Sequence, residues 1–127
     1  MQIRIYFDGG ASPNPGKAYG SYSVESETLN HKATRQQFGG PLTNNQAEYM
    51  ALIAALKWLS HHADPASTTL SIFTDSTLVR GQIGRKWKCK VLHLKELVME
   101  AKCLLADYQD WRIEWNSRNV NVKKFGH

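Results

Sequence analysis

The sequence is poor in the features that mark secreted, disulfide-bonded or membrane proteins. It has only two cysteines, Cys89 and Cys103, which lie apart without metal-ligand spacing, and this argues against a disulfide scaffold. The longest apolar stretch, residues 49–59, is interrupted by Lys57 and is too short to cross a bilayer. The first residues do not have the charged and apolar regions of a signal peptide. We therefore expect a reduced, cytoplasmic protein that does not enter a membrane.

The chain also lacks internal repeats, low-complexity tracts and any linker long enough to divide it. Residues 1–127 are therefore predicted to form a single domain, which is long enough for one hydrophobic core. Acidic residues are outnumbered by 11 to 16, and the net charge is +5. A basic balance favours an anionic partner such as nucleic acid, although charge alone would equally fit a solvated basic surface.

Hydrophobic periodicity predicts an α/β protein. Alternating apolar residues indicate strands, and apolar residues at a spacing of 3.6 indicate helices. The predicted strands are 3–7, 20–24, 33–38, 70–74 and 111–115, and the predicted helices are 44–62, 77–83 and 94–105. This order of three strands, helix, strand, two helices and strand is typical of a mixed sheet layered with helices.

Three acids occupy distinctive positions in this pattern. Asp8 is predicted to end the first strand, Asp75 ends the fourth, and Glu48 heads the apolar stripe of the long helix. If they converge, their mutual repulsion requires cations, and Mg²⁺ suits carboxylate oxygens. Two such ions roughly 4 Å apart would clamp a phosphodiester. Taken singly, each acid could instead be structural: an Asx-turn at Asp8, an N-cap at Asp75 and a surface glutamate at position 48.

These acids lie in three segments that together resemble type 1 ribonuclease H. The segments are FDGGASPNPG (7–16), LTNNQAEYMAL (42–52) and FTDSTLV (73–79), and the resemblance extends from Gln2 to about Trp115. It implies the ribonuclease H fold, a five-stranded mixed sheet flanked by helices. It also implies hydrolysis of the RNA strand of RNA/DNA hybrids with two Mg²⁺ or Mn²⁺ ions, leaving 5′-phosphate and 3′-hydroxyl ends. Asp8, Glu48 and Asp75 match the metal-binding acids of the family.

The same resemblance implies residues that contact the hybrid. Asn14, Asn44 and Asn45 match positions that grip the minor groove, where amides can bind the ribose 2′-hydroxyl. Thr43 matches a threonine that binds a DNA phosphate, and Arg118 could contact a phosphate as well. The asparagines and Thr43 would also serve as turn and cap residues, which does not exclude binding.

A basic stretch follows the second predicted helix, and it contains Trp87 and Lys88. Lys88 and its basic neighbours could contact phosphates, while Trp87 could support the sugar-phosphate backbone. An equally good interpretation is a core-packing tryptophan beside solvated lysines. Family members with a longer basic insertion here would hold the substrate more tightly than this chain.

The C-terminal part departs from the family pattern. Members normally carry a fourth acid that opens a final helix, in a motif like W-x-P-R-x-x-N-x-x-A-D, but Phe125 stands at that position here. The final helix is therefore predicted to be short, a single turn or absent. The fourth metal ligand could be His127, Asn119 or Asn121, or the second ion could be held poorly. The family's product-release histidine has no match unless His127 takes that role.

Three functions remain to be weighed. The leading hypothesis is a hybrid-specific endonuclease that works as a monomer without an obligate protein partner. The second is a hybrid-binding module with weakened catalysis, which the missing acid favours and the three intact acids oppose. The third is a resolvase or integrase core on the same fold, which the segments TNNQAE and SPNPG oppose because they suit a 2′-hydroxyl reader.

Overall fold

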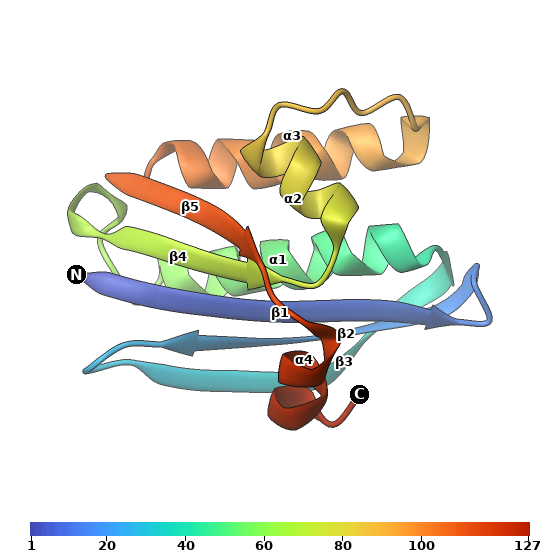
Figure 1. Ribbon diagram of the computed structural model, residues 1–127, viewed down its shortest axis with the longest axis horizontal. Helices are drawn as coiled ribbons and strands as arrows, with labels where there is room; N and C mark the ends of the chain where they lie inside the picture. The colour runs from blue at the N-terminus through green and yellow to red at the C-terminus, as the bar shows by residue number, and fades with distance from the viewer.

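The computed structural model describes residues 1–127 as a five-stranded mixed sheet with helices on both faces (Figure 1). The spatial order of the strands is β3-β2-β1-β4-β5. Neighbours are antiparallel on the β2 and β3 side of β1 and parallel on the β4 and β5 side. The strands are β1 (Gln2–Ser12), β2 (Gly16–Glu25), β3 (Asn30–Leu42), β4 (Thr69–Thr74) and β5 (Asp110–Trp115). The helices are α1 (Asn44–Ser60), η1 (Pro65–Ser67), α2 (Thr77–Gly84), α3 (Leu92–Ala106) and α4 (Arg118–Phe125).

The central strand β1 has a different covering on each face. Ile3, Ile5 and Phe7 are buried in the core on which α1 packs. On the opposite face, the ammonium of Lys124 in α4 lies 4.0 Å from the ring centroid of Tyr6. The same ammonium donates to Glu25 Oε2 of β2 at 2.6 Å, and these contacts hold α4 against the sheet. The ribbon shows α4 on its own face, apart from α1 and α3.

Helix α1 forms where the sequence predicts it. Thr43 caps it: its hydroxyl accepts from the Gln46 backbone, and the Gln46 side chain accepts from the Thr43 backbone. The predicted apolar stripe is buried from Ala51 to Leu59, and Glu48 is buried at its head. The carboxylate of α1 therefore enters the core side of the sheet.

Strands β1, β2 and β3 are several residues longer than predicted, and the extensions of β1 and β3 change where those two strands end. β1 does not end at Asp8 but continues to Ser12, because pairing with β2 continues to Ser12 opposite Lys17. β3 continues through Gly39, Gly40 and Pro41, beyond its predicted end at residue 38, because its end pairs with the start of β2. Both extensions come from strand pairing, which local turn propensity does not report.

The final helix is short, with eight residues, which confirms one of the expected alternatives; it is neither absent nor a single turn. Its amphipathic pattern is weak, but Asn121 and Phe125 are buried against the rest of the protein. Tertiary packing therefore stabilises α4 where periodicity does not predict it. No helix is long and apolar enough to span a membrane.

Candidate active site

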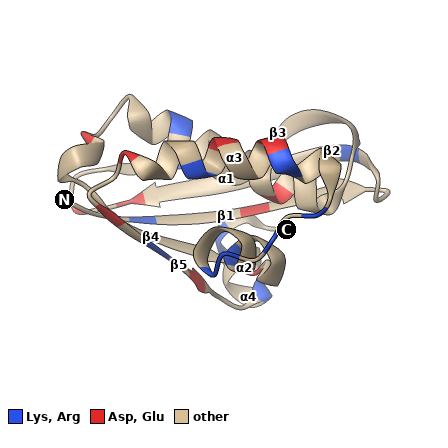
Figure 2. Cartoon of the chain, turned by 90° about the horizontal axis from the view of Figure 1, so that it is seen from above, with Lys and Arg blue, Asp and Glu red and all other residues tan.

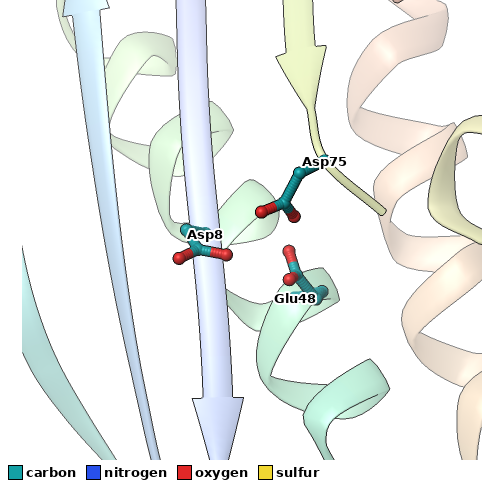
Figure 3. Close-up of side chains that lie close together, drawn as sticks. All are labelled: Asp8, Glu48 and Asp75. Atoms are coloured by element: carbon teal, nitrogen blue, oxygen red, sulfur yellow. The ribbon is translucent and has the colours of Figure 1, made fainter. Parts of the chain in front are cut away.

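The three predicted acids converge on one point. Asp8 comes from β1, Glu48 from α1 and Asp75 from the turn after β4, and one ligand oxygen from each lies within 4.8 Å of the others. Figure 3 shows the three carboxylates pointing toward one another, with β1 running on beyond Asp8. The expected convergence is confirmed, although Asp8 lies within its strand and not at its end.

The acids meet because β4 stops where β1 continues. The parallel pairing of β1 with β4 ends at Tyr6 opposite Phe73, so this edge of β1 is free at Asp8. Gly9 allows helix α1 to approach β1 closely, because a Cβ atom at Gly9 would collide with the backbone of Ala47 and Glu48. The missing side chain allows the first turns of α1 to touch β1, which brings Glu48 beside Asp8.

Burial and mutual repulsion raise the pKa values of this cluster. The pKa of Asp8 is raised to about 6, first by burial and then by the negative charge of Asp75. The pKa of Glu48 is raised well above its ordinary range by burial and by the charges of Asp8 and Asp75. No lysine or arginine forms an ion pair with any of the three. The cluster therefore carries negative charge that the protein itself leaves largely uncompensated.

A divalent cation fits this arrangement. The donors are all carboxylate oxygens, which are the ligands that Mg²⁺ and Mn²⁺ accept. Glu48 Oε2 is buried and has no hydrogen-bond partner, which is costly unless a cation meets it. Asp8, Glu48 and Asp75 are thus the residues that could hold metal.

His127 reaches this site from the end of α4. Its Nδ1 lies 3.3 Å from Asp8 Oδ2 and its Nε2 lies 2.5 Å from Ser21 Oγ, with the ring edge-on to Tyr19. The side chain is 5% exposed, so it packs against the protein and does not extend into solvent. Burial lowers the pKa of His127, and the charge of Arg35 adds to this effect. The histidine contacts an acid of the cluster, but its nitrogens are not among the mutually close ligand atoms.

The other candidates for a fourth ligand are less well placed. Asn119 is exposed, and Asn121 is fully buried with both side-chain amide atoms unpaired. Neither lies among the residues that line the acidic cleft. Phe125, the position at which the resemblance predicts a fourth acid, is buried at the end of α4.

The predicted substrate residues divide into two groups, and the first borders the acids. Asn44, Asn45 and Arg118 line the same cleft as the acids. Asn14 lies next to them, since its Oδ1 accepts from the Asn44 backbone at 3.0 Å. Asn44 Oδ1 in turn accepts from the Ala11 backbone at 2.7 Å, so this pair ties the β1–β2 turn to the start of α1.

The second group lies away from the cleft lining. The hydroxyl of Thr43 is engaged in the helix cap. Trp87 is 47% exposed and rests against the backbone of Gly81 in α2, so it is not the fully buried core residue of the alternative interpretation. Lys88 is exposed beside it. The basic residues of α4 and of the segment after α2 are blue in Figure 2.

Sequence reasoning missed three residues at this site: Tyr19, Ser21 and Trp115. Tyr19 and Trp115 line the cleft, and Ser21 contacts His127. Ser21 is directly opposite Asp8 in the β1–β2 pairing. The register of that hairpin would have identified Ser21, but the length of the turn could not be predicted from the sequence.

Comparison with known proteins gives consistent results. A family model described as RNase H matches residues 1–123. A ribonuclease HI of Halobacterium salinarum is 34% identical over 122 residues, which cover 96% of this chain and 60% of that protein. The crystal structure of RNase H1 from this archaeon has a TM-score of 0.85 at 30% identity, covering 99% of this chain and 92% of the other.

Two further matches extend the comparison. The bifunctional protein Rv2228c of Mycobacterium tuberculosis is 34% identical over 123 residues; the match covers 96% of this chain but only 33% of that protein. LC11-RNase H1 in complex with an RNA/DNA hybrid has a TM-score of 0.85 at 29% identity, covering 96% of this chain and 90% of the other. The present chain thus spans about a third of the mycobacterial relative it matches.

Proposed function

The chain belongs to the RNase H family, and on this premise we propose that it is an endonuclease that hydrolyses the RNA strand of RNA/DNA hybrids. The observation that carries the proposal is the convergence of Asp8, Glu48 and Asp75 in a cleft that Asn44 and Asn45 also line. The acids supply a site for chemistry on phosphates, and the asparagines supply amides that suit a ribose 2′-hydroxyl. The proposal includes a monomeric protein that acts in the reducing cytoplasm.

The three acids would hold divalent cations, Mg²⁺ or Mn²⁺ and two in number. When bound, such ions neutralise the charge that develops on the scissile phosphate and promote attack by water. The chain contributes the negative charge, the burial of Asp8 and Glu48, and the unpaired oxygen of Glu48. Attack by water at phosphorus with departure of the 3′-oxygen would leave 5′-phosphate and 3′-hydroxyl ends.

The surface around the acids would position the hybrid. The Oδ1 atoms of Asn14 and Asn44 already accept backbone N–H groups, so their NH₂ groups remain as donors toward the minor groove. Arg118 borders the acids and would bind a phosphate near the scissile bond. Thr43, Trp87 and Lys88 would contact the backbone farther away, with Trp87 offering an exposed ring.

One observation favours the second candidate, a hybrid-binding module with weakened catalysis. No acidic residue follows Glu114, and a neutral side chain, Phe125, stands where the family pattern has the fourth acid. A second ion would then have fewer anionic ligands. Under this candidate the chain would bind the hybrid but cleave it slowly or only with Mn²⁺.

Cleavage of an end-labelled RNA/DNA hybrid decides between the two. Wild type and Asp75→Asn are compared in Mg²⁺ and in Mn²⁺, with Asp107→Asn as a control that removes an exposed carboxylate elsewhere. We expect cleavage of the RNA strand only, its loss in Asp75→Asn and its retention in Asp107→Asn. Ligation of the products to a 3′-hydroxyl acceptor tests the 5′-phosphate. Binding without cleavage in either ion would contradict the nuclease and support the binding module.

A further inference from the structure

The side chain of His127 links the metal-site acid Asp8 to the neighbouring strand β2. Its Nδ1 faces Asp8 Oδ2 at 3.3 Å, and its Nε2 faces Ser21 Oγ at 2.5 Å. Ser21 is the residue directly opposite Asp8 in the β1–β2 pairing and is fully buried. The imidazole therefore bridges a cross-strand pair on the face of the sheet that α4 covers.

A third contact leaves the Ser21 hydroxyl hydrogen available to His127. The backbone N–H of Arg35 donates to Ser21 Oγ at 2.8 Å, because a backbone nitrogen can only donate. The single hydroxyl hydrogen of Ser21 is then free to point at His127 Nε2, which accepts it. A neutral imidazole that accepts at Nε2 carries its hydrogen on Nδ1, which is the nitrogen 3.3 Å from Asp8 Oδ2. In this arrangement Ser21 is hydrogen-bonded on both sides, and the Nδ1 hydrogen is left for the nearby carboxylate of Asp8.

A β-bulge makes the Arg35 N–H available. Between the pairs Gly20–Gln36 and Tyr22–Ala33, β3 has one residue more than β2, and Arg35 has a φ of 51°. A non-glycine residue in this left-handed region is strained, and bulges of this kind occur next to functional sites. Here the bulge turns the Arg35 N–H onto a side chain.

The end of α4 places the imidazole of His127 beside Asp8. Phe125 is buried, and Gly126 follows it as a left-handed C-cap with a φ of 77°. This cap turns the chain back toward the sheet, so that His127 contacts Asp8 and Tyr19. Phe125, at the position where the resemblance predicts a fourth acid, is thus a buried apolar residue. His127, two residues later, contacts Asp8.

We infer that His127 is a positioning residue: held by Ser21, it donates a hydrogen bond to Asp8 and fixes that carboxylate for the divalent cation without binding the cation itself. The inference rests on the proposed cation site at Asp8, Glu48 and Asp75. A ligand held by such an outer hydrogen bond keeps its orientation when the ion is absent, which strengthens ion binding. Sequence reasoning suggested His127 as a metal ligand, and this inference assigns it a different role.

The test compares affinities for Mn²⁺, measured by calorimetry on the full chain without substrate. His127→Asn retains an N–H donor close to the position of Nδ1, His127→Gln retains a polar group close to Nε2, and His127→Ala retains neither. We expect His127→Ala and His127→Gln to bind Mn²⁺ about tenfold more weakly and His127→Asn to stay close to wild type. Ser21→Ala should weaken binding as well, and adding it to His127→Ala should have no further effect.

Lys124→Ala is the matched control, because it removes an α4 contact with the sheet but leaves Asp8, Ser21 and His127 in place. If Lys124→Ala weakens Mn²⁺ binding as much as His127→Ala does, the inference is overturned. The effect would then come from the packing of α4 on the sheet and not from the imidazole. His127→Asn as weak as His127→Ala would overturn it in favour of direct ligation by the imidazole. Unchanged affinity in every His127 variant would overturn it while leaving the proposed function intact.

A second measurement, made on the same protein, does not depend on ion binding. Nitrogen-15 NMR of the histidines without metal should show His127 with its hydrogen on Nδ1, and Ser21→Ala should change that signal. A hydrogen on Nε2 would overturn the inference. Failure of wild type to bind Mn²⁺ would contradict the proposed cation site, and this NMR result would still decide the hydrogen bond to Asp8.

Discussion

Gly9 of β1 lies directly against the backbone of Ala47 in α1, and a Cβ atom on Gly9 would overlap the Ala47 carbonyl group. This contact sets the distance between the strand that carries Asp8 and the helix that carries Glu48. The active site thus depends on a residue that has no side chain.

Substituting Gly9 by alanine should therefore damage the site and the fold together. The new methyl group meets backbone atoms that cannot rotate away, so α1 must shift from β1 and take Glu48 with it. We expect the free energy of unfolding to fall by about 1–3 kcal/mol and cation affinity to fall with it. Urea denaturation and Mn²⁺ calorimetry measure the two effects. Ser12→Ala, on an exposed part of the same strand, is the control; wild-type values for Gly9→Ala would contradict the contact.

Much of the fold could be predicted because local pattern and tertiary structure agree. The capping box at Thr43 and the apolar stripe that ends at Leu59 give α1 nearly its full extent. The convergence of Asp8, Glu48 and Asp75 was also predictable, since the apolar periodicity places each acid on or beside a predicted strand or helix. Such features depend on neighbours in sequence, which the sequence displays.

The features that were missed depend on pairing between distant segments. The extension of β1 beyond Asp8 requires β2 as a partner, and α4 requires the face of the sheet on which Phe125 packs. The contact between Ser21 and His127 joins residues 106 positions apart. It depends on the hairpin register and on the bulge at Arg35, neither of which periodicity reveals.

Without metal, the cluster should make the protein less stable at neutral pH than at mildly acidic pH. The pKa of Asp8 is raised in the folded state to about 6 from an ordinary 3.8, so the folded protein holds a proton that the unfolded chain has lost. Stability should then fall as the pH rises from about 4 to 6 and stay low above that range. The raised pKa of Glu48 acts in the same direction. Denaturation with a chelator present, at pH 5 and pH 7.5, measures the change.

Asp75→Asn should remove part of the electrostatic repulsion among the three carboxylates. The charge of Asp75 raises the pKa of both Asp8 and Glu48, so its removal should stabilise the metal-free protein at pH 7.5 by about 1 kcal/mol. The gain should shrink at pH 4, where the other two carboxyls are protonated. Saturating Mg²⁺ should reverse the order by stabilising wild type more than the variant. A variant less stable than wild type in chelator at pH 7.5 would contradict the repulsion.

Cation affinity should rise with pH across a range where isolated carboxylates no longer titrate. Protons and cations compete for Asp8 and Glu48, whose pKa values are raised. We expect Mn²⁺ affinity to increase about tenfold per pH unit for each proton displaced, between about pH 5 and 7. Calorimetry in two buffers of different ionisation enthalpy counts the protons released. An affinity that is constant from pH 5.5 to 7 would show that the acids are already ionised in the metal-free protein.

The structural and binding roles of Asn44 can be separated by two substitutions. Asn44→Asp retains an oxygen that accepts from the Ala11 backbone but loses the NH₂ donors, whereas Asn44→Ala loses both. We expect wild-type stability for Asn44→Asp and a loss of about 0.5–1 kcal/mol for Asn44→Ala. Both should bind the hybrid more weakly, because neither presents a donor to the minor groove and Asn44→Asp adds a negative charge near phosphates.

Asn45→Ala completes this series, since the amide of Asn45 borders the acids and forms no hydrogen bond within the protein. Its loss should leave stability unchanged and should reduce the preference for RNA/DNA hybrid over DNA duplex, because an amide can tell the two apart through the 2′-hydroxyl. Competition binding with both duplexes, in a cation that does not support cleavage such as Ca²⁺, measures that preference apart from turnover. If Asn44→Asp binds the hybrid as well as wild type and Asn45→Ala keeps the full preference, the amides at the start of α1 do not recognise RNA. The hybrid would then be selected by the shape of its backbone alone.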